Sequence, residues 1–422
     1  MQKKWMTSTE VFEDYERRFA QARLDKPMSR PWEPEQREKI SAATKRMLRY
    51  DEALVPTIHN MEEISRVEHD GYAAIQLRYQ TWEQMYGCAT LFLPHKEGKL
   101  PLVFVCCGHG DQGRLSLSYM GMGHRLASLG MAALVMENIG QGDRNPHPEK
   151  GKHPNHWLAV APFQCGLTLQ GLVVMETIAM IRYMQNDPRF DASRFGACGN
   201  SGGGTLTMFL AALAKELSVI ASSGYPSEAT YLLQKERRHC ACNLLIGQAH
   251  EAEMWEMYSL FAPKPLLLSN GVFDNLIPMD LSHRNGRKVH NTYVQMGKEE
   301  NFTHKLTKTK HSWDVADVNL ISGFLSRHLL GVTPAEEITE IFAVEDLEPL
   351  RVSIPEDCLT TAQLSEKLSG KKAEEGKELA DVFRPKLHGV EVDPDELQLD
   401  VGRGDVMRVL AQFECTLYKE EQ

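Results

Sequence analysis

Apolar and polar positions repeat with different periods along the chain, and each period predicts a different kind of element. Between residues 7 and 50, apolar side chains recur at helical spacing, and Thr7 with Glu10 can form a capping box, so this segment is predicted to be helical. From about Glu62 the segments GYAAIQLRYQ and GCATLFLP contain alternating, β-branched or aromatic positions bounded by Gly and Pro. These two segments are predicted to be antiparallel strands.

Short, wholly apolar runs follow in the middle of the chain. They read LPLVFVCC, MAALVMEN, RFGACGN, LSVIASSG and KPLLLSNG. Each run ends in small or polar residues, and helix-length segments such as 169–183 and 205–215 separate them. Strands of a parallel sheet look like this because helices cover both of their faces. The pattern predicts an α/β fold with a doubly wound, mostly parallel sheet.

Two long segments, 145–166 and 227–260, interrupt the α/β pattern, and the second is long enough to form a small cap. Both are expected at the end of the sheet where ligands bind in α/β folds. After Gly331 the periodicity fades into charged, alternating pieces. We therefore divide the chain into an N-terminal helical segment (1–60), an α/β domain (61–330) with its cap insertion at about 227–260, and a C-terminal extension (331–422).

Charge is distributed unevenly between these parts. The whole chain has 47 Lys and Arg against 57 Asp and Glu, a formal charge of −10. Residues 331–422 hold 22 of the acidic and 10 of the basic residues, so the extension carries −12 and the first 330 residues carry +2. This balance disfavours a nucleic-acid-binding protein. The acidic extension is predicted to be solvated and outside the chemistry, either packed on the α/β domain or mediating a homo-oligomer.

Targeting signals and structural cysteine patterns are not recognisable in the sequence. The first residues form no apolar core of a signal peptide, and no stretch of 18 uncharged apolar residues occurs, so we expect a cytoplasmic protein without a membrane partner. Nine cysteines form an odd set without the spacing of a disulfide scaffold or a zinc site. They are interpreted as reduced thiols, and no metal site is predicted.

The sequence Gly199-Asn200-Ser201-Gly202-Gly203 lies between the predicted strand RFGAC and a helix expected to begin near Thr205. In a nucleophile elbow, the serine occupies such a strained strand-to-helix turn and projects above the sheet. Ser201 is thus the candidate nucleophile, and the backbone N–H of Gly202 is a candidate oxyanion donor. The alternatives are a glycine-rich turn that only tightens packing and a phosphate-binding loop, for which the Walker lysine is absent.

A nucleophilic serine needs a base, and the base needs an orienting acid. Asp274 follows the strand-like run KPLLLSN, and His311 precedes the last amphipathic helix of the α/β domain. The order Ser201, Asp274, His311 is the order that an elbow-type fold requires. The rival residues are Asp280 for the acid and His283, His290 and His304, interpreted as solvated, for the base.

A second oxyanion donor is expected on the loop after LPLVFVC, which reads Cys-Gly-His-Gly-Asp-Gln-Gly-Arg over residues 107–114. The backbone N–H of His109 is the candidate, and Asp111 is the alternative. Asn200, beside the nucleophile, and Trp157, in the polar interruption, are candidates for the substrate pocket.

Two further polar stretches are given structural interpretations. The loop 137–144 is predicted to be a turn held by an internal hydrogen bond of Asp143 or Arg144. His147, His153 and His156 are flanked by prolines and lysines, which favours an exposed loop over a three-histidine metal site.

At these residues the chain resembles serine hydrolases of the α/β-hydrolase superfamily, close to the acetyl xylan esterase and dienelactone hydrolase-like branch. The resemblance runs from about residue 85 to 330. It rests on Gly-His-Gly followed by a basic residue, Ile-Gly-Gln-Gly-Asp-Arg, Asp-Pro-Arg-Phe-Asp-Ala-Ser-Arg-Phe-Gly before Gly-Asn-Ser-Gly-Gly-Gly-Thr, Pro-Leu-Leu-Leu with its following Asp, and Lys-His-Ser-Trp. The chain departs from the branch at Cys107, where a histidine is usual, and at Arg114, where a lysine is common.

The resemblance implies that Ser201 is the nucleophile, His311 the general base and Asp274 its orienting acid, with Gly202 and His109 as oxyanion donors. It implies a serine carboxylester hydrolase that needs no cofactor and removes a short acyl group, acetyl first, from a small-molecule ester of a sugar or other small alcohol. The alternatives are a serine peptidase of the prolyl-oligopeptidase type, a dienelactone or lactone hydrolase, and a non-catalytic binding protein of this fold.

Overall fold

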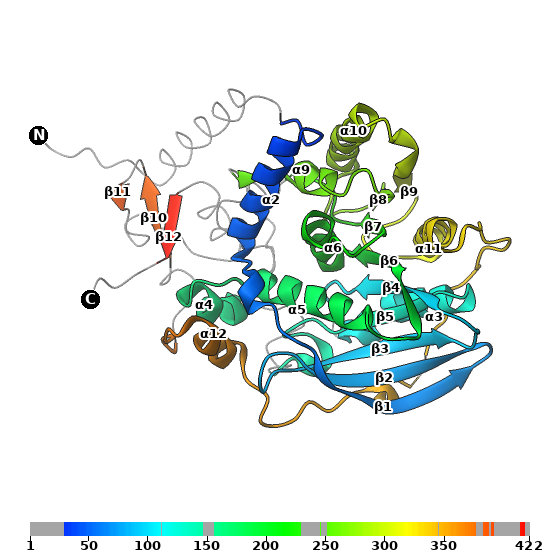
Figure 1. Cartoon of the computed structure of the whole chain (residues 1–422), viewed down its shortest axis with the longest axis horizontal. Coiled ribbons are helices and arrows are strands. Elements are labelled where there is room, and N and C mark those ends of the chain that lie inside the picture. The colour runs from blue at the N-terminus through cyan, green and yellow to red at the C-terminus, as the bar shows by residue number, and fades with distance from the viewer. Residues whose placement is uncertain are drawn as a thin grey trace, which may run out of the picture.

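A nine-stranded sheet organises the molecule, and its strand order can be followed in Figure 1. The computed structural model describes residues 29–110, 112–146, 156–228, 245, 251–344, 346–376, 383–387, 390–391 and 414–417. In chain order the strands are β1 (His59–His69), β2 (Tyr72–Gln80), β3 (Tyr86–Pro94), β4 (Leu100–Cys106), β5 (Ala132–Met136), β6 (Phe190–Asn200), β7 (Val219–Ser223), β8 (Leu266–Gly271) and β9 (Phe302–Thr307). Across the sheet the order is β1-β2-β3-β5-β4-β6-β7-β8-β9.

Strand direction divides the sheet into two parts. The strands β1, β2 and β3 are antiparallel to one another, and β3 is antiparallel to β5. From β5 to β9 every neighbouring pair is parallel. Cys106 at the end of β4 is level with Met136 of β5 and Gly199 of β6, so the loops that follow these three strands leave from one edge. The predicted α/β fold with a mostly parallel sheet is confirmed.

Helices cover both faces of the sheet. One face packs against α3 (Leu117–Ser128) and α11 (Val315–Leu330); the other packs against α2 (Pro34–Leu48), α5 (Leu169–Met184), α6 (Gly202–Leu213), α9 (Met254–Ser259) and α10 (Met279–Gln295). Alternate residues of β4 enter different cores: Phe104 joins the α5 and α6 side, whereas Val103 and Val105 join the α3 and α11 side. Both faces of the sheet are buried beneath helices. This explains why the sequences of these strands are unbroken apolar runs.

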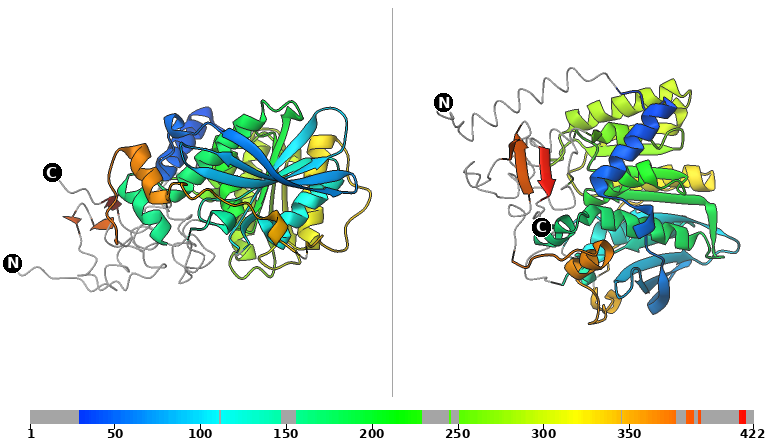
Figure 2. Two further views of the ribbon diagram at one scale, coloured as in Figure 1. Left: turned by 90° about the horizontal axis from the view of Figure 1, so that it is seen from below. Right: turned by 60° about the vertical axis from the view of Figure 1, so that its left-hand side comes forward.

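Shorter elements complete the described structure. They are α4 (His156–Gln164), α12 (Thr361–Ser369), and the 3-10 turns η1 (Glu52–Leu54), η2 (Gly113–Leu115), η3 (Gly142–Arg144), η6 (Glu299–Asn301) and η7 (Glu348–Leu350). A second sheet, of order β11-β10-β12, joins β10 (Phe383–Leu387), β11 (Val390–Glu391) and β12 (Glu414–Leu417). Figures 1 and 2 show it beside the main sheet and separate from it.

Within the described ranges, no single helix is long and apolar enough to cross a membrane. Residues Leu158–Gln164 and Leu169–Met184 meet the length and composition criteria only as a pair, bent by 90°. The second member of this pair is α5, which is buried along most of its length in the core of the molecule.

Within the predicted N-terminal helical segment, α2 occupies residues 34–48, whereas residues 49–58 contain only the short turn η1 and β1 already begins at His59. Arg37 of α2 donates hydrogen bonds to the carbonyls of Ser259, Leu260 and Ala262, at 3.2, 2.5 and 2.8 Å. These bonds fasten α2 to the end of α9. Residues 1–28 of the predicted segment lie outside the described residues.

The predicted cap at 227–260 lies mostly outside the described residues. Its last part, α9, is a buried core helix that packs on α6 and α10, so this part is not a cap. A capping box between Glu253 and Glu256 starts the helix, and Tyr258 is hydrogen-bonded to Ser222 of β7 at 2.8 Å. The division of the chain into three parts stays a prediction.

The segment after α11 packs on the α/β domain over residues 331–376. Leu350, Val352 and Leu364 are buried, with 5%, 2% and 0% of their surface exposed. On α3, Gly121 leaves the space that Ile341 fills, because a Cβ at Gly121 would lie 2.1 Å from the Ile341 side chain. Of the two predicted arrangements, packing on the α/β domain is the one observed for these residues, most of which remain exposed or half-buried while a few apolar side chains are buried. Charged residues are frequent in this segment, but a few of its apolar side chains are buried in the core.

Buried charges join this segment to the loops after β4 and β5. The side chain of Arg114 is fully buried, and its guanidinium donates to Asp143 at 2.5 Å and to the carbonyl of Leu350 at 2.7 Å. The backbone N–H of Arg114 donates to both carboxylate oxygens of Glu137, at 3.2 and 3.1 Å. Burial raises the pKa of Glu137 to about 7, although Arg114 opposes this shift.

Arg351 and Val352 add to the same cluster from the C-terminal side. Arg351 donates to Asp143 at 2.9 Å and to Gln112 at 2.6 Å, and the backbone N–H of Val352 also donates to Asp143 at 2.9 Å. Burial by itself would raise the pKa of Asp143, but Arg114 and these donors together lower it. Arg114, Glu137, Asp143 and Arg351 are called the loop cluster below.

Truncating Leu350 tests whether the C-terminal segment belongs to the core. We expect Leu350→Ala to lower the free energy of unfolding by about 2 to 5 kcal/mol, because it leaves a cavity in a well-packed site. Val332→Ala is the matched control in the same segment, since Val332 is 55% exposed, and it should change stability by less than about 0.5 kcal/mol. Urea denaturation of both variants measures this, and equal effects would contradict the assignment of Leu350 to the core.

Glu137 should give stability a specific dependence on pH. Folding raises the pKa of Glu137 from 4.5 to about 7. Between these two pH values the Glu137 carboxyl therefore keeps its proton in the folded protein and loses it in the unfolded chain. The stability contributed by the group is therefore present below pH 4.5 and is lost as pH rises toward 7. The free energy of unfolding of wild type minus that of Glu137→Gln should fall over this window, by up to roughly 3 kcal/mol at 1.36 kcal/mol per pKa unit. Exposed Glu97→Gln serves as the control, and a flat difference would refute the shift.

Candidate active site

Ser201 forms the turn between β6 and α6. Its φ of 58° and ψ of −120° lie in a region that non-glycine residues rarely adopt, at a cost of about 1 to 3 kcal/mol. The Ser201 N–H donates to the carbonyl of Ser223 on β7 at 3.1 Å, and the Ser201 carbonyl accepts from the N–H of Thr205 at 2.9 Å. Helix α6 begins at Gly202, earlier than expected from the sequence, so the helix starts immediately after the serine.

Two glycines allow this turn to sit against the sheet. A Cβ at Gly203 would lie 1.9 Å from the carbonyl oxygen of Cys106 on β4, and a Cβ at Gly199 would lie 2.2 Å from the carbonyl oxygen of Gly203. No side chain fits at either position without moving backbone. The glycines in the sequence pattern are thus explained by close backbone contact between α6 and the ends of β4 and β6.

The structure brings the three predicted residues Ser201, His311 and Asp274 into one hydrogen-bonded chain. His311 Nε2 lies 2.8 Å from Ser201 Oγ, and His311 Nδ1 lies 2.8 Å from Asp274 Oδ2. The Asp274 side chain is fully buried, and the His311 side chain is 22% exposed. This is the arrangement that a nucleophile, its base and an orienting carboxylate require.

Asp274 also holds its own loop. Its Oδ1 atom accepts from the backbone N–H groups of Leu276 and Ile277, at 2.8 and 2.9 Å. The carboxylate is therefore fixed through one oxygen while the other oxygen meets His311. The bonds of Oδ1 agree with the alternative interpretation of Asp274 as a turn residue, and they leave Oδ2 to His311.

The rival residues lie elsewhere. Asp280 is exposed in the first turn of α10, and His283 and His290 are exposed on the same helix. His304 on β9 is half-buried with its ring against Gly286, and burial lowers its pKa to about 4. The interpretation of His304 as solvated is therefore wrong, because α10 covers the strand on which it lies.

Asn200 has a different place from the one predicted. Its side-chain amide donates to the carbonyl of His311 at 3.0 Å and accepts from Ser223 Oγ at 3.1 Å. Ser223 Oγ in turn accepts from the indole N–H of Trp313 at 2.6 Å. Asn200 thus connects the loop of His311 to the end of β6. The sequence alone does not reveal this role, since the partners are 111 residues apart.

The loop after β4 lies directly against the elbow, as predicted for an oxyanion loop. The Cα of Gly108 is 3.4 Å from where a Cβ of Gly202 would be, and the imidazole of His109 is 2.7 Å from the same point. The N–H of Gly108 is occupied by the Tyr119 hydroxyl at 2.6 Å. The predicted donors Gly202 and His109 therefore lie on adjacent segments. Asp111, the alternative donor, and the side chain of Trp157, the pocket candidate, lie outside the described residues.

The loop cluster connects the loops after β4 and β5 at this edge of the sheet. Arg144 adds a second buried pair, donating to Glu176 of α5 at 2.7 and 2.9 Å and to the carbonyl of Glu137 at 3.0 Å. The interpretation of loop 137–144 as a turn held by Asp143 and Arg144 is consistent with these bonds. The contacts of the cluster with the C-terminal segment could not be predicted from the sequence, because Leu350 is 236 residues from Arg114.

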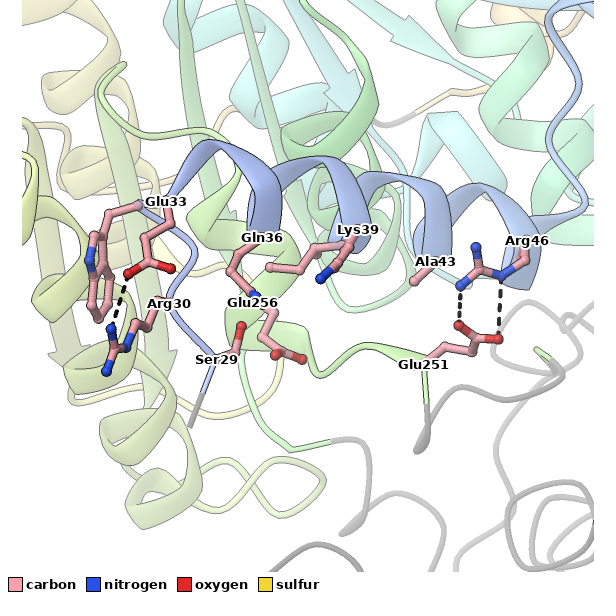
Figure 3. A pocket seen from close by; sticks show the side chains of 11 residues that line it. Ser29, Arg30, Glu33, Gln36, Lys39, Ala43, Arg46, Glu251 and Glu256 are labelled. Atoms are coloured by element: carbon pink, nitrogen blue, oxygen red, sulfur yellow. Dashed lines mark hydrogen bonds and ion pairs between the residues drawn. The ribbon is translucent and has the colours of Figure 1, made fainter. Parts of the chain in front are cut away.

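Two cavities differ sharply in size and in distance from the triad. One, of about 740 Å³, lies along α2 and is lined by charged side chains, with ion pairs of Arg30 with Glu33 and Arg46 with Glu251 (Figure 3). None of the triad residues lines it. The other, of about 10 Å³, is bordered by His109 and Gly202.

The described residues contain no cluster of three or more His, Cys, Asp or Glu side chains suited to a metal ion. Six described cysteines are free thiols, five of them buried. Cys240 and Cys242 lie outside the described residues.

Known proteins similar to this chain share its fold and part of its sequence. Residues 54–236, under half of the chain, match the family described as acetyl xylan esterase (AXE1). The hydrolase YtaP of Bacillus subtilis (strain 168) is 26% identical over 196 residues, which make up 44% of this chain and 64% of that protein. The match therefore spans less than two thirds of this curated relative.

Solved structures with the same fold include three esterases. Methylesterase BT1017 has a TM-score of 0.60 and 17% identity, covering 85% of this chain and 78% of its own. An acetyl xylan esterase structure from Bacteroides fragilis NCTC 9343 has a TM-score of 0.57 and 13% identity, with 70% and 82% covered. Glucuronoyl esterase from Solibacter usitatus has a TM-score of 0.53 and 12% identity, with 70% and 93% covered. The chain thus has the fold of these solved esterases, and its residues 54–236 are similar to the acetyl xylan esterase family.

Proposed function

We propose that this protein is a serine carboxylic ester hydrolase that acts through an acyl-enzyme. The observation that carries the proposal is the continuous chain of hydrogen bonds, each of 2.8 Å, from Ser201 through His311 to Asp274. Esterase relatives and the elbow geometry at Ser201 support the same chemistry.

In the first half-reaction, Ser201 Oγ attacks the ester carbonyl carbon while His311 Nε2 takes its proton. Asp274, bonded to Nδ1, holds the imidazole in the tautomer whose Nε2 can accept that proton, and it stabilises the imidazolium that forms. The imidazolium then gives the proton to the leaving alcohol, so the C–O bond breaks without expelling an alkoxide. An acyl-Ser201 ester remains.

Negative charge on the carbonyl oxygen needs donors that are already in place. The N–H of Gly202 is the first in α6 and has no partner within the helix, and the positive end of the helix dipole adds to its field. The N–H of His109 on the adjoining loop is the proposed second donor. Because the loop cluster and the Tyr119 hydroxyl fix this loop, the donors need little reorganisation during the reaction.

In the second half-reaction, water replaces the alcohol. His311 takes a proton from the water as its oxygen attacks the acyl carbon, and it then returns a proton to Ser201 Oγ as the acid leaves. The net reaction consumes one ester and one water and releases one alcohol and one acid.

The substrate proposed is a short acyl ester, acetyl first, of a sugar or another small alcohol. The cavity beside Gly202 and His109 measures about 10 Å³, roughly the room that one water-sized group requires. Such a cavity accommodates the methyl of an acetyl group and excludes long chains. The family that residues 54–236 match is named for an acetyl ester of a carbohydrate, which supports the same substrate class.

Hydrolysis of p-nitrophenyl acetate tests the proposal. Ser201→Ala should reduce kcat/KM by at least about 10³-fold, because the remaining site has no nucleophile. Ser193→Ala, on the exposed part of the same strand, should retain wild-type activity. An organophosphate should label wild type on Ser201, as located by peptide mass spectrometry. Full turnover by Ser201→Ala would show that the nucleophile is another residue.

Acyl length can be tested on the same enzyme. The substrates compared are p-nitrophenyl acetate, p-nitrophenyl butyrate and a peptide p-nitroanilide. We expect the acetate to have the highest kcat/KM. A preference for the peptide would replace the esterase proposal with the peptidase alternative.

Asn200→Ala tests the positioning of His311. Removal of the bonds to the His311 carbonyl and to Ser223 should lower kcat about tenfold, or ~1.4 kcal/mol, with little change in KM, because the base and nucleophile are less well aligned. Asn301→Ala provides a matched control. The side-chain amide of Asn301 also donates to a backbone carbonyl, that of Pro263 at 2.8 Å, but this bond lies at the surface. If kcat of Asn200→Ala stayed within twofold of wild type, the positioning role would be wrong.

A further inference from the structure

Two buried aromatic side chains lie between the loop after β4 and the loop that carries His311. Tyr119 belongs to the first turn of α3, and Trp313 follows His311 in the loop between β9 and α11, called the histidine loop below. Tyr119 is 6% exposed and Trp313 is 3% exposed. Their ring centroids are 5.7 Å apart with an angle of 70° between the planes, an edge-to-face contact of the kind that aromatic pairs favour. The pair therefore joins α3 to the histidine loop.

Tyr119 holds the loop after β4 at the point where this loop meets the elbow. Its hydroxyl accepts a hydrogen bond from the backbone N–H of Gly108 at 2.6 Å. A Cβ at Gly108 would lie 2.5 Å from this hydroxyl, 2.6 Å from the carbonyl oxygen of Asn200 and 3.2 Å from the backbone nitrogen of Gly202. The hydroxyl thus fixes the residue that precedes His109, the proposed second oxyanion donor.

Trp313 holds the histidine loop to the strand that supports the nucleophile. Its indole N–H donates to Ser223 Oγ at 2.6 Å, and the carbonyl of Ser223 accepts from the N–H of Ser201 at 3.1 Å. The backbone carbonyl of Trp313 also accepts from Ser118 Oγ, in the first turn of α3, at 3.3 Å. One residue of β7 therefore bonds both the histidine loop and the turn that carries the nucleophile.

We propose that Tyr119 and Trp313 form a positioning pair that couples the loop after β4 to the histidine loop and to the nucleophile. The contacts run without a break from the Gly108 N–H through the two rings to Ser223. A displacement of either loop relative to the other strains or breaks one of these contacts. The inference rests on the proposed function and adds to it the residues that set the separation between the oxyanion donors and the base.

This separation matters because the two loops act on the same reacting atoms. In the proposed reaction, donors at His109 and Gly202 hold the carbonyl oxygen while His311 moves the proton of the attacking and leaving groups. A misplacement of about 1 Å can lower a rate about 100-fold. Acylation and deacylation use the same donors and the same base, so both steps slow together when the pair is disturbed. We therefore expect kcat to fall while KM changes little.

Two conservative substitutions test the pair with p-nitrophenyl acetate as the substrate. Tyr119→Phe keeps the ring and removes the acceptor of the Gly108 N–H, and Trp313→Phe removes the indole N–H. Each should lower kcat at least about tenfold and leave KM within about twofold of wild type. Tyr293→Phe is the matched control. Tyr293 is also buried and its hydroxyl also bonds the backbone, at the Lys264 carbonyl 2.7 Å away, but it lies on α10, and kcat should stay at the wild-type value.

Inhibition by a trifluoromethyl ketone gives an independent measurement. Ser201 Oγ adds to the ketone carbonyl carbon, His311 takes the serine proton, and the hemiketal oxyanion that forms resembles the transition state of ester hydrolysis. Such analogues bind through the contacts that the transition state makes. The inhibition constant should therefore rise at least about fivefold in Tyr119→Phe and in Trp313→Phe, and it should stay unchanged in Tyr293→Phe.

The double variant Tyr119→Phe/Trp313→Phe tests whether the two residues act as one unit. Effects of residues in one network do not add as free energies. The loss of kcat in the double variant should therefore be smaller than the product of the two single losses, by at least about threefold. Losses that simply multiplied would show two independent supports and would overturn the coupling.

A purely structural role predicts a different result. In that case urea denaturation would show lower stability of the variants, while kcat and the inhibition constant of the folded protein equalled those of wild type, and the inference would be wrong. Wild-type turnover of p-nitrophenyl acetate separates this outcome from failure of the proposed function, which would show as no turnover by wild type. If one single variant did not fold, kcat and the inhibition constant of the other would decide.

Discussion

The backbone at Ser201 is the constraint on which the site depends. A φ of 58° at a residue with a side chain is unfavourable, and it persists because β7 bonds its N–H and α6 bonds its carbonyl. The same turn points Oγ at His311 and leaves the Gly202 N–H free of helical bonds. It also brings α6 so near to β4 that Gly203 cannot carry a Cβ. The positions of the candidate nucleophile and candidate oxyanion donor and the pattern of glycines thus have one structural cause.

Around this turn, two kinds of polar network fix the positions of His311, Asp274 and the loop after β4. Asn200, Ser223 and Trp313 fasten the backbone of His311, and Asp274 is fastened through the oxygen that does not meet the imidazole. Behind the loop after β4 the restraint is ionic, because the loop cluster places the buried carboxylates of Glu137 and Asp143 beside the buried Arg114 and the partly exposed Arg351. Buried charges of this kind are costly to separate, so they fix the relative positions of the loops more than they add net stability.

Much of the fold could be predicted because its signals are local. Buried parallel strands are continuous apolar runs, and the elbow is a short sequence between a strand and a helix, so Ser201, Asp274 and His311 could be chosen by order and context. Contacts between distant segments could not be predicted. The acidity of residues 331–422 masked the few apolar side chains, such as Leu350, that reach the core. Likewise, a glutamine in a sequence gives no sign that its amide is buried unpaired, as at Gln141 and Gln170.

The contact between Arg114 and the carbonyl of Leu350 has a consequence for the order in which the protein is made. Synthesis proceeds from the N-terminus, and domains generally fold as units as they emerge. A nascent chain that has just completed α11 contains Ser201, Asp274 and His311, yet Arg114 and Asp143 still lack their partners at 350–352. These contacts of the loops after β4 and β5 therefore form only after a segment beyond His311 has been translated.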